Sequence, residues 1–416
     1  MIFAPLKTWR MSRRSRCVAK PDDNATPGLP WGLNFLSVGI YTLLILHGPQ
    51  DSQNMELKQT PLYAEHIRLG AKCAEFGGWN MPIQYSGIIS EHMWTRTQCS
   101  LFDICHMAEF RIENPLRNPG MEKLVTVGLS RMACGSCRYG FILDETGGVI
   151  DDIIVYKISD NQWMMVVNAA TAEGDFEYLR KRIASDISLE NLSNDLGKLD
   201  LQGPLARDVL ATVAGEKIKD LAYYTFARFP VLGADCIISR TGYTGELGYE
   251  IYFPRERIVE LWQRFLQDDR VKPAGLGARD TLRLEVGLPL YGQDVTRNTT
   301  PLEAGAEKYI DFRKDFIGKD ALVKQNKSGI PRRLVFMTTD SRRSPRHGFE
   351  IHQDGRHVGE VTSGTYSPSL EQGIAAGYVT AGAAQAGTPL LLRHQNIVLN
   401  ATVVERPLYK KGTARS

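Results

Sequence analysis

The chain has 416 residues, more than one hydrophobic core usually organises, so we expect two or three domains. Hydrophobic residues make up 43% and charged residues 23% of the chain, which excludes a disordered protein and a multispanning membrane protein. The 50 Lys and Arg residues nearly balance 47 Asp and Glu residues, and a net charge of +3 argues against a protein that holds nucleic acid by its phosphates.

Residues 1–54 differ from the rest of the chain. Residues 1–21 contain six cations and no acid, and residues 31–48 carry no formal charge. The basic, acid-free start is typical of a mitochondrial transit segment. The apolar stretch is shorter than a typical membrane span, and it lacks the small-residue cleavage site of a secretory signal. A further interpretation is that the functional chain begins at Met55 and that the upstream residues have no role in the fold.

Helical and strand patterns alternate after residue 57. Residues 85–101 predict a helix with Ser86 as its cap and with Glu91 and Arg96 on its solvated face. Residues 138–143, 149–158 and 163–168 then predict three strands of an antiparallel meander.

The remaining patterns complete an α+β prediction. The expected helices span 172–183, the residues after Gly203-Pro204 through Val213, 255–266 and 278–286, and the expected strands span 199–201, 236–240 and 249–253. From Pro331 onward, six short apolar runs predict an all-β domain, either a small barrel or a jelly roll. The residues around Lys324, Lys327, Ser328 and Gly329 predict a polar linker before it.

The segment Gly147-Gly-Val-Ile-Asp151-Asp152 is the first candidate for chemistry. Two adjacent acids in a strand point to opposite faces of the sheet, so one of them faces inward if the other faces solvent. A carboxylate on the inner face requires a partner or a ligand. The alternative is that the Gly-Gly turn and the strand twist leave both acids in water.

The second candidate is the loop Arg240-Thr-Gly-Tyr-Thr-Gly-Glu-Leu-Gly-Tyr-Glu250. Its three glycines let the backbone approach a ligand closely, and it lacks the sequence of a phosphate-binding loop. Tyr243 offers a flat surface and Glu250 an acceptor pair for a planar heterocycle with adjacent N–H donors. The alternative is a hairpin with solvated acids.

Arg279 is the third candidate, at the start of a predicted helix. A guanidinium there is suited to a bidentate contact with a carboxylate or a heterocyclic oxygen. Its other interpretation is a surface ion pair with Asp280 or Glu285.

The cysteines and histidines provide no catalytic signature. Seven scattered cysteines favour reduced thiols over a disulfide framework, and Cys134 and Cys137 lack the second pair of a zinc site. No metal site is expected, and His106 is expected to be a structural hydrogen-bonding residue.

Several motifs in this order and spacing resemble one family, the aminomethyltransferases (T-proteins) of the glycine cleavage system. The likeness covers about residues 57–410 and rests on the following segments: Thr60-Pro-Leu-Tyr63, Phe76-Gly-Gly-Trp79-Asn-Met-Pro-Ile-Gln-Tyr85, Leu101-Phe-Asp-Ile-Cys-His-Met107, Gly147-Gly-Val-Ile-Asp-Asp152, Leu201-Gln-Gly-Pro204, Thr241-Gly-Tyr-Thr-Gly-Glu-Leu-Gly-Tyr-Glu250, Gly277-Ala-Arg279-Asp, Leu290-Tyr-Gly-Gln-Asp294 and Gly359-Glu-Val-Thr-Ser-Gly364.

The resemblance implies a three-domain clover-leaf around a central folate channel. Two ferredoxin-like α+β domains, intertwined in sequence, would lie within residues 55–318 and a C-terminal β domain within 330–416, after the unmatched extension 1–54. The implied reaction moves the aminomethyl carbon from the dihydrolipoyl sulfur of the H-protein to tetrahydrofolate, and it releases ammonia and gives 5,10-methylenetetrahydrofolate.

The resemblance also implies residue roles. Asp152 matches the family's key carboxylate, which is expected near N5 and N10 of the folate. Glu250 matches the acid that accepts hydrogen bonds from the pterin amino group and ring N–H. Arg279 matches the family's folate-binding arginine. Five further residues match positions that line the family's pocket, and a sixth closes it from the C-terminal side: Tyr139, Tyr156, Asn168, Tyr243, Met107 and Tyr409.

The resemblance leaves alternatives and sets further expectations. A folate-binding iron–sulfur assembly protein and a folate-dependent demethylase share this fold, and a non-catalytic module tethered to a membrane by residues 1–54 is a third alternative. The expected partners are the lipoylated H-protein and, indirectly, the P- and L-proteins, with neither nucleic acid nor a membrane. The expected location is the cytoplasm of a bacterial cell, or the mitochondrial matrix if residues 1–54 are a transit segment.

Overall fold

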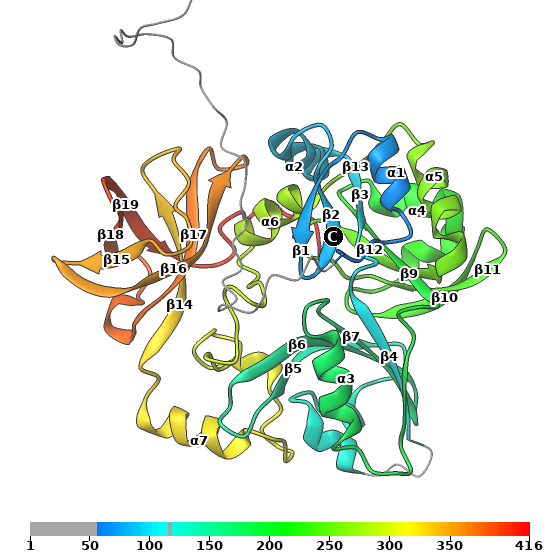
Figure 1. Cartoon of the computed structure of the whole chain (residues 1–416), viewed down its shortest axis with the longest axis horizontal. Coiled ribbons are helices and arrows are strands. Elements are labelled where there is room, and N and C mark those ends of the chain that lie inside the picture. Colours follow the sequence, from blue (N-terminus) through cyan, green and yellow to red (C-terminus); the bar gives the residue numbers. More distant parts are fainter. Residues whose placement is uncertain (1–55, 115–118) are drawn as a thin grey trace, which may run out of the picture. The chain divides into compact units, whose positions relative to one another are not determined.

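The computed structural model describes residues 56–114 and 119–416, which belong to one compact unit. The expectations about residues 1–54 lie outside the described residues. The described chain contains one mixed sheet, one antiparallel sheet, a two-stranded hairpin and a closed barrel, with helices packed around them (Figure 1). The predicted α+β fold with a C-terminal β domain is confirmed.

The first sheet has six strands in the order β10-β11-β12-β9-β3-β13. Only β13 pairs in parallel, with β3, while the other neighbours are antiparallel. The strands are β3 (Cys99–Asp103), β9 (Leu196–Gln202), β10 (Phe226–Val231), β11 (Ala234–Ser239), β12 (Gly248–Pro254) and β13 (Val271–Pro273).

One face of this sheet forms the largest apolar core. Leu199 and Leu201 of β9 alternate with polar residues, as the period of two in a strand requires, and they pack in one cluster with Trp262. The helices that supply this cluster are α4 (Ala206–Ala214) and α5 (Ile258–Leu266), with α1 (Tyr63–Arg68) at its edge. The opposite face of β9 therefore carries Lys198, Asp200 and Gln202.

The second sheet is inserted in sequence between β3 and β9 of the first. Its order is β5-β6-β7-β4-β8, all antiparallel, and β5, β6 and β7 form the predicted meander. The elements are β4 (Ala108–Glu113), β5 (Cys137–Leu143), β6 (Val149–Ser159), β7 (Gln162–Val167) and β8 (Ser188–Asn191), with α3 (Ala172–Arg180) against one face.

The two sheets pack face to face. Tyr156 and Met164 of the second sheet share an apolar cluster with Phe226 and Tyr252 of the first. The polar face of β9 is therefore turned toward the second sheet, and its buried polar groups require partners there or on a ligand.

Past residue 331, six strands close into a barrel, which excludes the jelly roll. Its order is β14-β17-β16-β15-β18-β19. The strands are β14 (Arg332–Thr339), β15 (Glu350–Gln353), β16 (Arg356–Ser367), β17 (Gln372–Thr380), β18 (Pro389–His394) and β19 (Ile397–Val404). The expected polar linker is helix α7 (Lys319–Ser328), whose Leu322 is fully buried against the Gly147 turn.

Helix α2 (Ile88–Thr97) contradicts the predicted orientation. Glu91 and Arg96 are 2% and 7% exposed, whereas Ile89 is 56% exposed. The carboxylate of Glu91 accepts hydrogen bonds from the backbone N–H groups of residues 85, 86, 87 and 275, which makes its burial favourable. Gly87, not Ser86, occupies the cap position.

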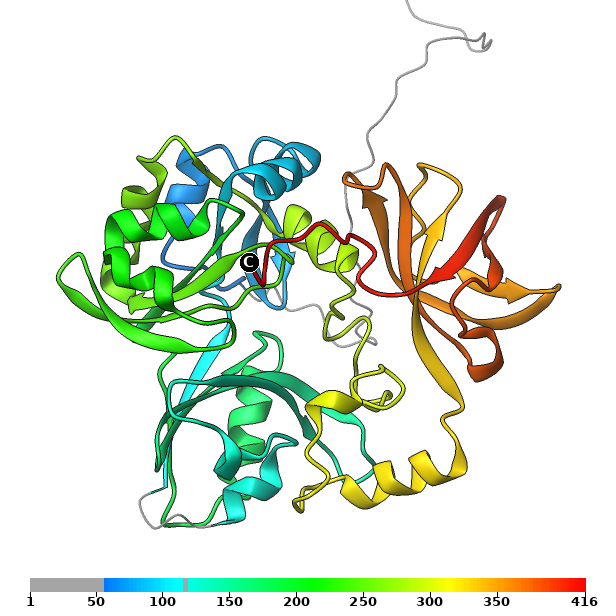
Figure 2. The ribbon, with the colours of Figure 1, turned by 180° about the vertical axis from the view of Figure 1, so that it is seen from behind.

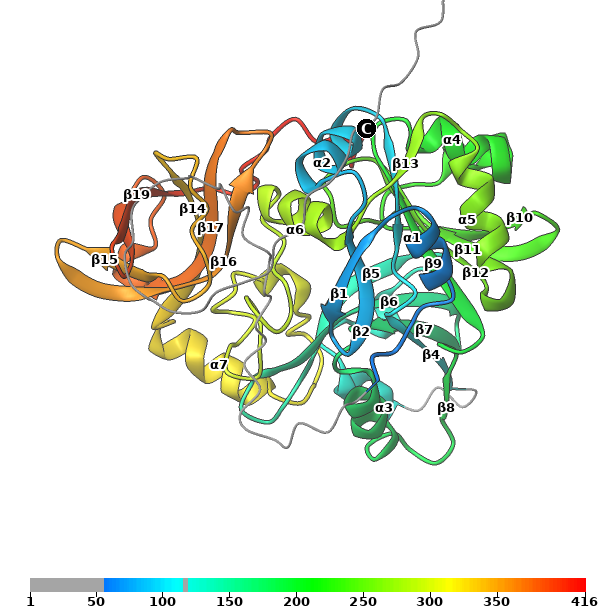
Figure 3. The same ribbon diagram turned by 45° about the horizontal axis from the view of Figure 1, so that its top comes forward.

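Helix α6 (Leu276–Glu285) connects the parts of the described unit. It contacts the hairpin of β1 (Lys72–Phe76) and β2 (Trp79–Gln84) through β2, and it also contacts α2 and the barrel strands β16 and β17 (Figure 3). The C-terminal segment leaves the barrel and runs past α6 to the first sheet (Figure 2), where the N–H of Ala414 donates to the carbonyl of Gly245. Among residues 56–114 and 119–416, no helix is long and apolar enough to cross a membrane.

Candidate active site between two facing sheets

The paired acids of β6 lie on opposite faces of the second sheet, as predicted. Asp151 is fully buried, and Asp152 has intermediate exposure on the face turned to the first sheet. The amide of Asn168, just after β7, donates to Oδ1 of both carboxyls at 2.8 Å. The interpretation that both acids lie in water is therefore wrong, because one side chain amide binds them together.

Asp152 has a fixed orientation. The hydroxyl of Tyr139 on β5 donates to its Oδ2 at 2.8 Å, opposite the bond from Asn168. Burial raises the pKa of Asp152, and these two hydrogen bonds oppose the shift. Burial and the neighbouring carboxyls of Asp175 and Asp152 raise the pKa of Asp151 well above its usual range. Asp152 thus combines low solvent exposure with two directed donors.

Glu250 of β12 lies between the sheets and is 4% exposed. Its Oε2 accepts from Thr241 at 2.8 Å and from Tyr156 at 3.2 Å, and its Oε1 lies 3.8 Å from Nζ of Lys198. The interpretation of this loop as a hairpin with solvated acids is therefore wrong. The Oε1 side of the carboxylate is less occupied than the Oε2 side.

Arg279 of α6 pairs with Asp200 of β9, at 2.5 Å between Nη1 and Oδ2. The two acids that were expected to pair with Arg279 bind other arginines instead. Asp280 accepts a hydrogen bond from Arg283, and Glu285 accepts one from Arg96. The tertiary fold brings Asp200 to the guanidinium from 79 residues away, and this contact overturns the expected local pair.

Tyr243 and Arg279 form a stacked pair. The guanidinium carbon lies 4.9 Å from the ring centroid, and the Tyr243 hydroxyl donates to the carbonyl of Pro289. These two contacts fix the orientation of the Tyr243 ring.

Met107 and Tyr409 differ in their surroundings. The sulfur of Met107 lies 3.9 Å from Nζ of Lys198, beside Glu250. Tyr409 lies with its ring 4.2 Å from the guanidinium carbon of Arg96, and its backbone N–H donates to the carbonyl of Glu285. Tyr409 thus packs on the buried charges of α2 and α6.

The groups around Asp152, Glu250 and Arg279 influence one another electrostatically. Burial raises the pKa of Tyr243, and the charge of Asp152 adds to the shift. Burial also raises the pKa of Asp200 to about 6, where Arg279 opposes the shift and Glu250 adds to it. The charges of Asp152 and Arg279 thus both act on Tyr243, and those of Arg279 and Glu250 both act on Asp200.

Comparisons with known proteins agree with this arrangement. Residues 62–314 match the family model of the GCVT N-terminal domain, and residues 332–410 match that of the glycine cleavage T-protein C-terminal barrel domain. The chain belongs to the glycine cleavage T-protein family.

Relatives and a solved structure extend the match over most of the chain. An aminomethyltransferase of Caldanaerobacter subterraneus is 41% identical over 86% of this chain and 97% of its own length. An aminomethyltransferase of Halothermothrix orenii is 42% identical over 84% of this chain and 99% of its own length. The crystal structure of the glycine cleavage system aminomethyltransferase T from Bartonella henselae has a TM-score of 0.82 at 34% identity, covering 86% of this chain and 99% of that one. None of these relatives is named for iron–sulfur assembly or demethylation.

The sequence reasoning missed three polar residues of β9 in this T-protein fold. Lys198, Asp200 and Gln202 share the face of β9 turned to the second sheet, and all three are buried. The alternation Lys-Leu-Asp-Leu-Gln was the available signal, because polar residues at every second position of a central strand define one polar face. The strand predicted over 199–201 is shorter than β9 and leaves out Lys198 and Gln202.

The glycines of the loop 240–250 lie close to other parts of the protein. A Cβ at Gly242 or Gly248 would lie 2.2 or 2.0 Å from the side chain of Gln202. Gly245 adopts a φ of 82°. These glycines accommodate Gln202 and the turn of the loop, and their closeness to a ligand stays a prediction.

His106 and the cysteines add no catalytic group. Burial lowers the pKa of His106 to about 4, and its Nδ1 has no hydrogen-bond partner among the described residues. Cys134 is exposed and Cys137 is buried in the cluster between the sheets.

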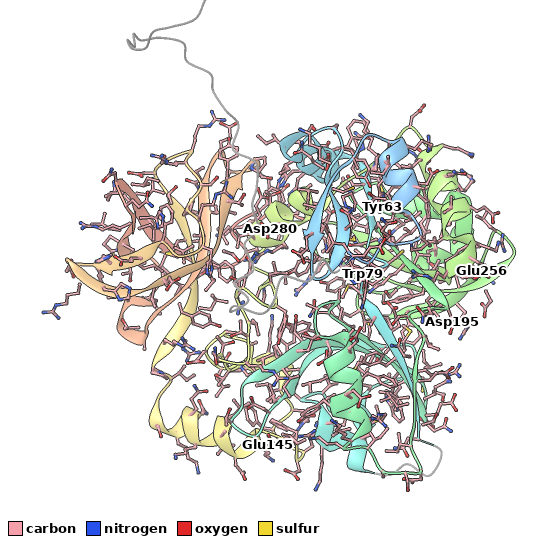
Figure 4. All side chains as sticks on the ribbon, in the orientation of Figure 1. Tyr63, Trp79, Glu145, Asp195, Glu256 and Asp280 are labelled. Atoms are coloured by element: carbon pink, nitrogen blue, oxygen red, sulfur yellow. The ribbon has the colours of Figure 1, made fainter. Side chains whose placement is uncertain are left out.

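A separate cavity of about 430 Å³ lies near β7, β11 and β12. Asp195 and Glu256, close together in Figure 4, belong to its lining, and so does Tyr252. Tyr252 donates to the hydroxyl of Tyr156 at 2.9 Å, and Tyr156 in turn donates to Glu250. None of the predicted site residues lines this cavity.

Proposed function

We propose that this T-protein family member transfers a one-carbon unit from the aminomethylated lipoyl arm of the H-protein to tetrahydrofolate. The C–S bond to the dihydrolipoyl group and the C–N bond to the amino group break, and the carbon forms bonds to N5 and N10 of the folate. The two protons lost from N5 and N10 end on the lipoyl sulfur and on the departing ammonia. The products are the dihydrolipoyl group, ammonia and 5,10-methylenetetrahydrofolate.

Asp152 is the proposed catalytic residue. Positive charge develops on the carbon as ammonia leaves and an iminium-like species forms. A carboxylate held by Tyr139 and Asn168 stabilises that charge without having to reorient, and low solvent exposure strengthens the interaction.

The remaining residues are proposed to bind the folate. Glu250 accepts from the 2-amino group and N3–H of the pterin, and Arg279 binds a carboxylate or ring oxygen, with Tyr243 as the flat surface beside it. Tyr139, Tyr156, Asn168 and Met107 line the pocket. Tyr409 is proposed to close it from the C-terminal side, through its contact with Arg96.

Partners, location and domain limits belong to the same proposal. The lipoylated H-protein is the direct partner, and the P- and L-proteins act through it. We place the enzyme in the cytoplasm, with the mitochondrial matrix as the alternative if residues 1–54 are a transit segment. The proposed catalytic region is 55–318, and the proposed barrel domain is 330–416.

The observation that carries the proposal is the oriented Asp152 on β6, the strand whose Tyr156 donates to the buried Glu250, in a chain of this family. The test is ammonia release from aminomethylated H-protein with and without tetrahydrofolate, with methylenetetrahydrofolate measured in parallel. We expect tetrahydrofolate to accelerate ammonia release and one methylenetetrahydrofolate to form per ammonia. Ammonia release that does not depend on tetrahydrofolate would contradict the proposal.

A further inference from the structure

Lys198 is a buried cation in the candidate site that the reaction described above does not use. It lies on β9 directly opposite Tyr252 of β12, on the same face as Glu250, and is 1% exposed. Lysine side chains are rarely this deeply buried without close partners.

The ammonium group of Lys198 has no oxygen acceptor within hydrogen-bond distance among the described residues. It carries three N–H donors, yet among the described residues only the thioether of Met107, at 3.9 Å, accepts from it. Oε1 of Glu250 is 3.8 Å away, beyond hydrogen-bond distance, and the ring centroid of Tyr252 is 5.0 Å away. A thioether is a weak acceptor, so an oxygen acceptor from a ligand would improve this environment.

One carboxyl lies near the Lys198 ammonium group, and a second is influenced by it. Oε1 of Glu250 is 3.8 Å from Nζ of Lys198, and the charge of Lys198 acts on the pKa of the buried Glu109 of β4. Burial raises the pKa of Glu109 to about 7, with Lys198 opposing the shift, and its Oε1 has no hydrogen-bond partner among the described residues. An opposite charge is therefore near Lys198, but no oxygen acceptor of the described residues is within hydrogen-bond distance of its Nζ.

The edge of a pterin ring fits this pair of opposite charges. Along that edge the 2-amino group and N3–H are donors, and the 4-oxo oxygen next to them is an acceptor. A carboxylate matches the two donors, and a cation beside its less occupied oxygen matches the acceptor. Charge-assisted hydrogen bonds of this kind are stronger than neutral ones.

We propose that Lys198 is a specificity-determining residue that donates a hydrogen bond to the 4-oxo oxygen of the tetrahydropterin while Glu250 holds the neighbouring donors. This inference rests on the proposed function, because it requires that a folate binds between the sheets. It assigns the 4-oxo oxygen to Lys198, so that of the two partners proposed above for Arg279 the folate carboxylate remains.

The test compares two ligands that differ only at the 4-position. Tetrahydrofolate and its 4-amino-4-deoxy analogue are titrated anaerobically into the full chain, and the ratio of their Kd values is measured by calorimetry. The analogue places a donor against the donor of Lys198, so we expect the wild type to prefer the 4-oxo compound by about 10- to 100-fold. In Lys198→Met that preference should fall at least about 10-fold, with weaker binding of the 4-oxo compound.

Two further variants make the result specific. Lys157→Met removes another buried lysine, whose Nζ has its own acceptor in the carbonyl of Met132 at 3.0 Å, and should leave the ratio unchanged. Lys198→Gln keeps a neutral N–H donor and should show an intermediate ratio, since neutral hydrogen bonds are roughly half as strong. This variant decides the question if Lys198→Met does not fold.

Three outcomes are distinguishable. A reduced ratio in both Lys198 variants supports the proposal. Equal weakening of both ligands, or a wild-type ratio in Lys198→Gln, overturns it and makes Lys198 a counter-charge for Glu250 only. If the wild type binds neither compound, the proposed function itself fails.

Discussion

Asp152 and Glu250 are both buried or half-buried carboxyls in the same interface, but their surroundings differ. Asp152 receives hydrogen bonds on both oxygens, whereas Glu250 is bound mainly through Oε2. A carboxylate whose oxygens are both engaged acts best through its charge, and one with an open oxygen acts best as an acceptor. This difference supports separate roles in catalysis and binding.

We therefore expect two isosteric substitutions to change different quantities, one the kcat and the other the Kd of tetrahydrofolate. Asp152→Asn should lower kcat by about 100- to 1000-fold with little change in the Kd of tetrahydrofolate, since it removes a charge needed in the transition state. Glu250→Gln should raise that Kd by about 10- to 100-fold and leave kcat at saturation within a few-fold. Steady-state kinetics and calorimetry measure both quantities.

The control for these variants is Glu145→Gln. Glu145 lies on the turn between β5 and β6 (Figure 4), its side chain is 72% exposed, and it is near Asp152 in sequence only. Its substitution should change neither quantity. If Asp152→Asn weakened binding and Glu250→Gln lowered kcat, the two assigned roles would have to be exchanged.

At the scale of elements, helix α2 shows that buried polar side chains can determine which face of a helix points inward. Its charged residues Glu91 and Arg96 point inward because each finds partners on other elements, while Ile89 is left exposed. The guanidinium of Arg96 bonds to Glu246 at 2.9 Å and to Glu285 at 2.7 Å. Arg96 thus connects α2 to the Gly-rich loop and to α6.

Removal of the buried Arg96 cation should destabilise the protein far more than removal of an exposed apolar residue from the same helix. Arg96→Met leaves two buried carboxylates without their cation and should lower the free energy of unfolding by about 3–5 kcal/mol. Ile89→Ser should change it by less than about 0.5 kcal/mol. Urea unfolding followed by circular dichroism measures both, and similar effects of the two changes would refute the inverted orientation of α2.

At the scale of the whole described unit, contacts between distant segments hold the site loop. Thr413, in the segment after the barrel, donates to Oε2 of Glu246 at 2.6 Å and accepts from the backbone N–H of Leu247 at 2.9 Å. The loop that carries Tyr243 and leads into Glu250 is therefore stabilised by hydrogen bonds from the segment that follows the barrel.

Thr413→Val should loosen this loop without unfolding the protein. Loss of these hydrogen bonds at about 1 kcal/mol each corresponds to at least a fivefold faster amide exchange in residues 243–248, measured by hydrogen exchange and mass spectrometry. Thr402→Val, on an exposed position of β19, is the matched control and should leave exchange in that loop unchanged. Unchanged exchange in Thr413→Val would show that the C-terminal segment does not stabilise the loop.

Local patterns determined much of the fold. The meander, the strands of the barrel and helices α3 to α6 follow from hydrophobic periodicity and from glycine or proline at the turns, which act within a few residues. The opposite faces of Asp151 and Asp152 follow from the same geometry. The order and spacing of the motifs further indicated the family.

Only the tertiary structure decided which polar groups meet. Arg279 pairs with Asp200, Arg96 with Glu246 and Glu285, and Lys198 approaches Glu250, all across long separations in sequence. No local pattern contains such pairs, because the free energy of burying a charge depends on which partner the fold brings to it. The sequence by itself therefore determined the elements and the family, while the packing of two sheets determined the polar site between them.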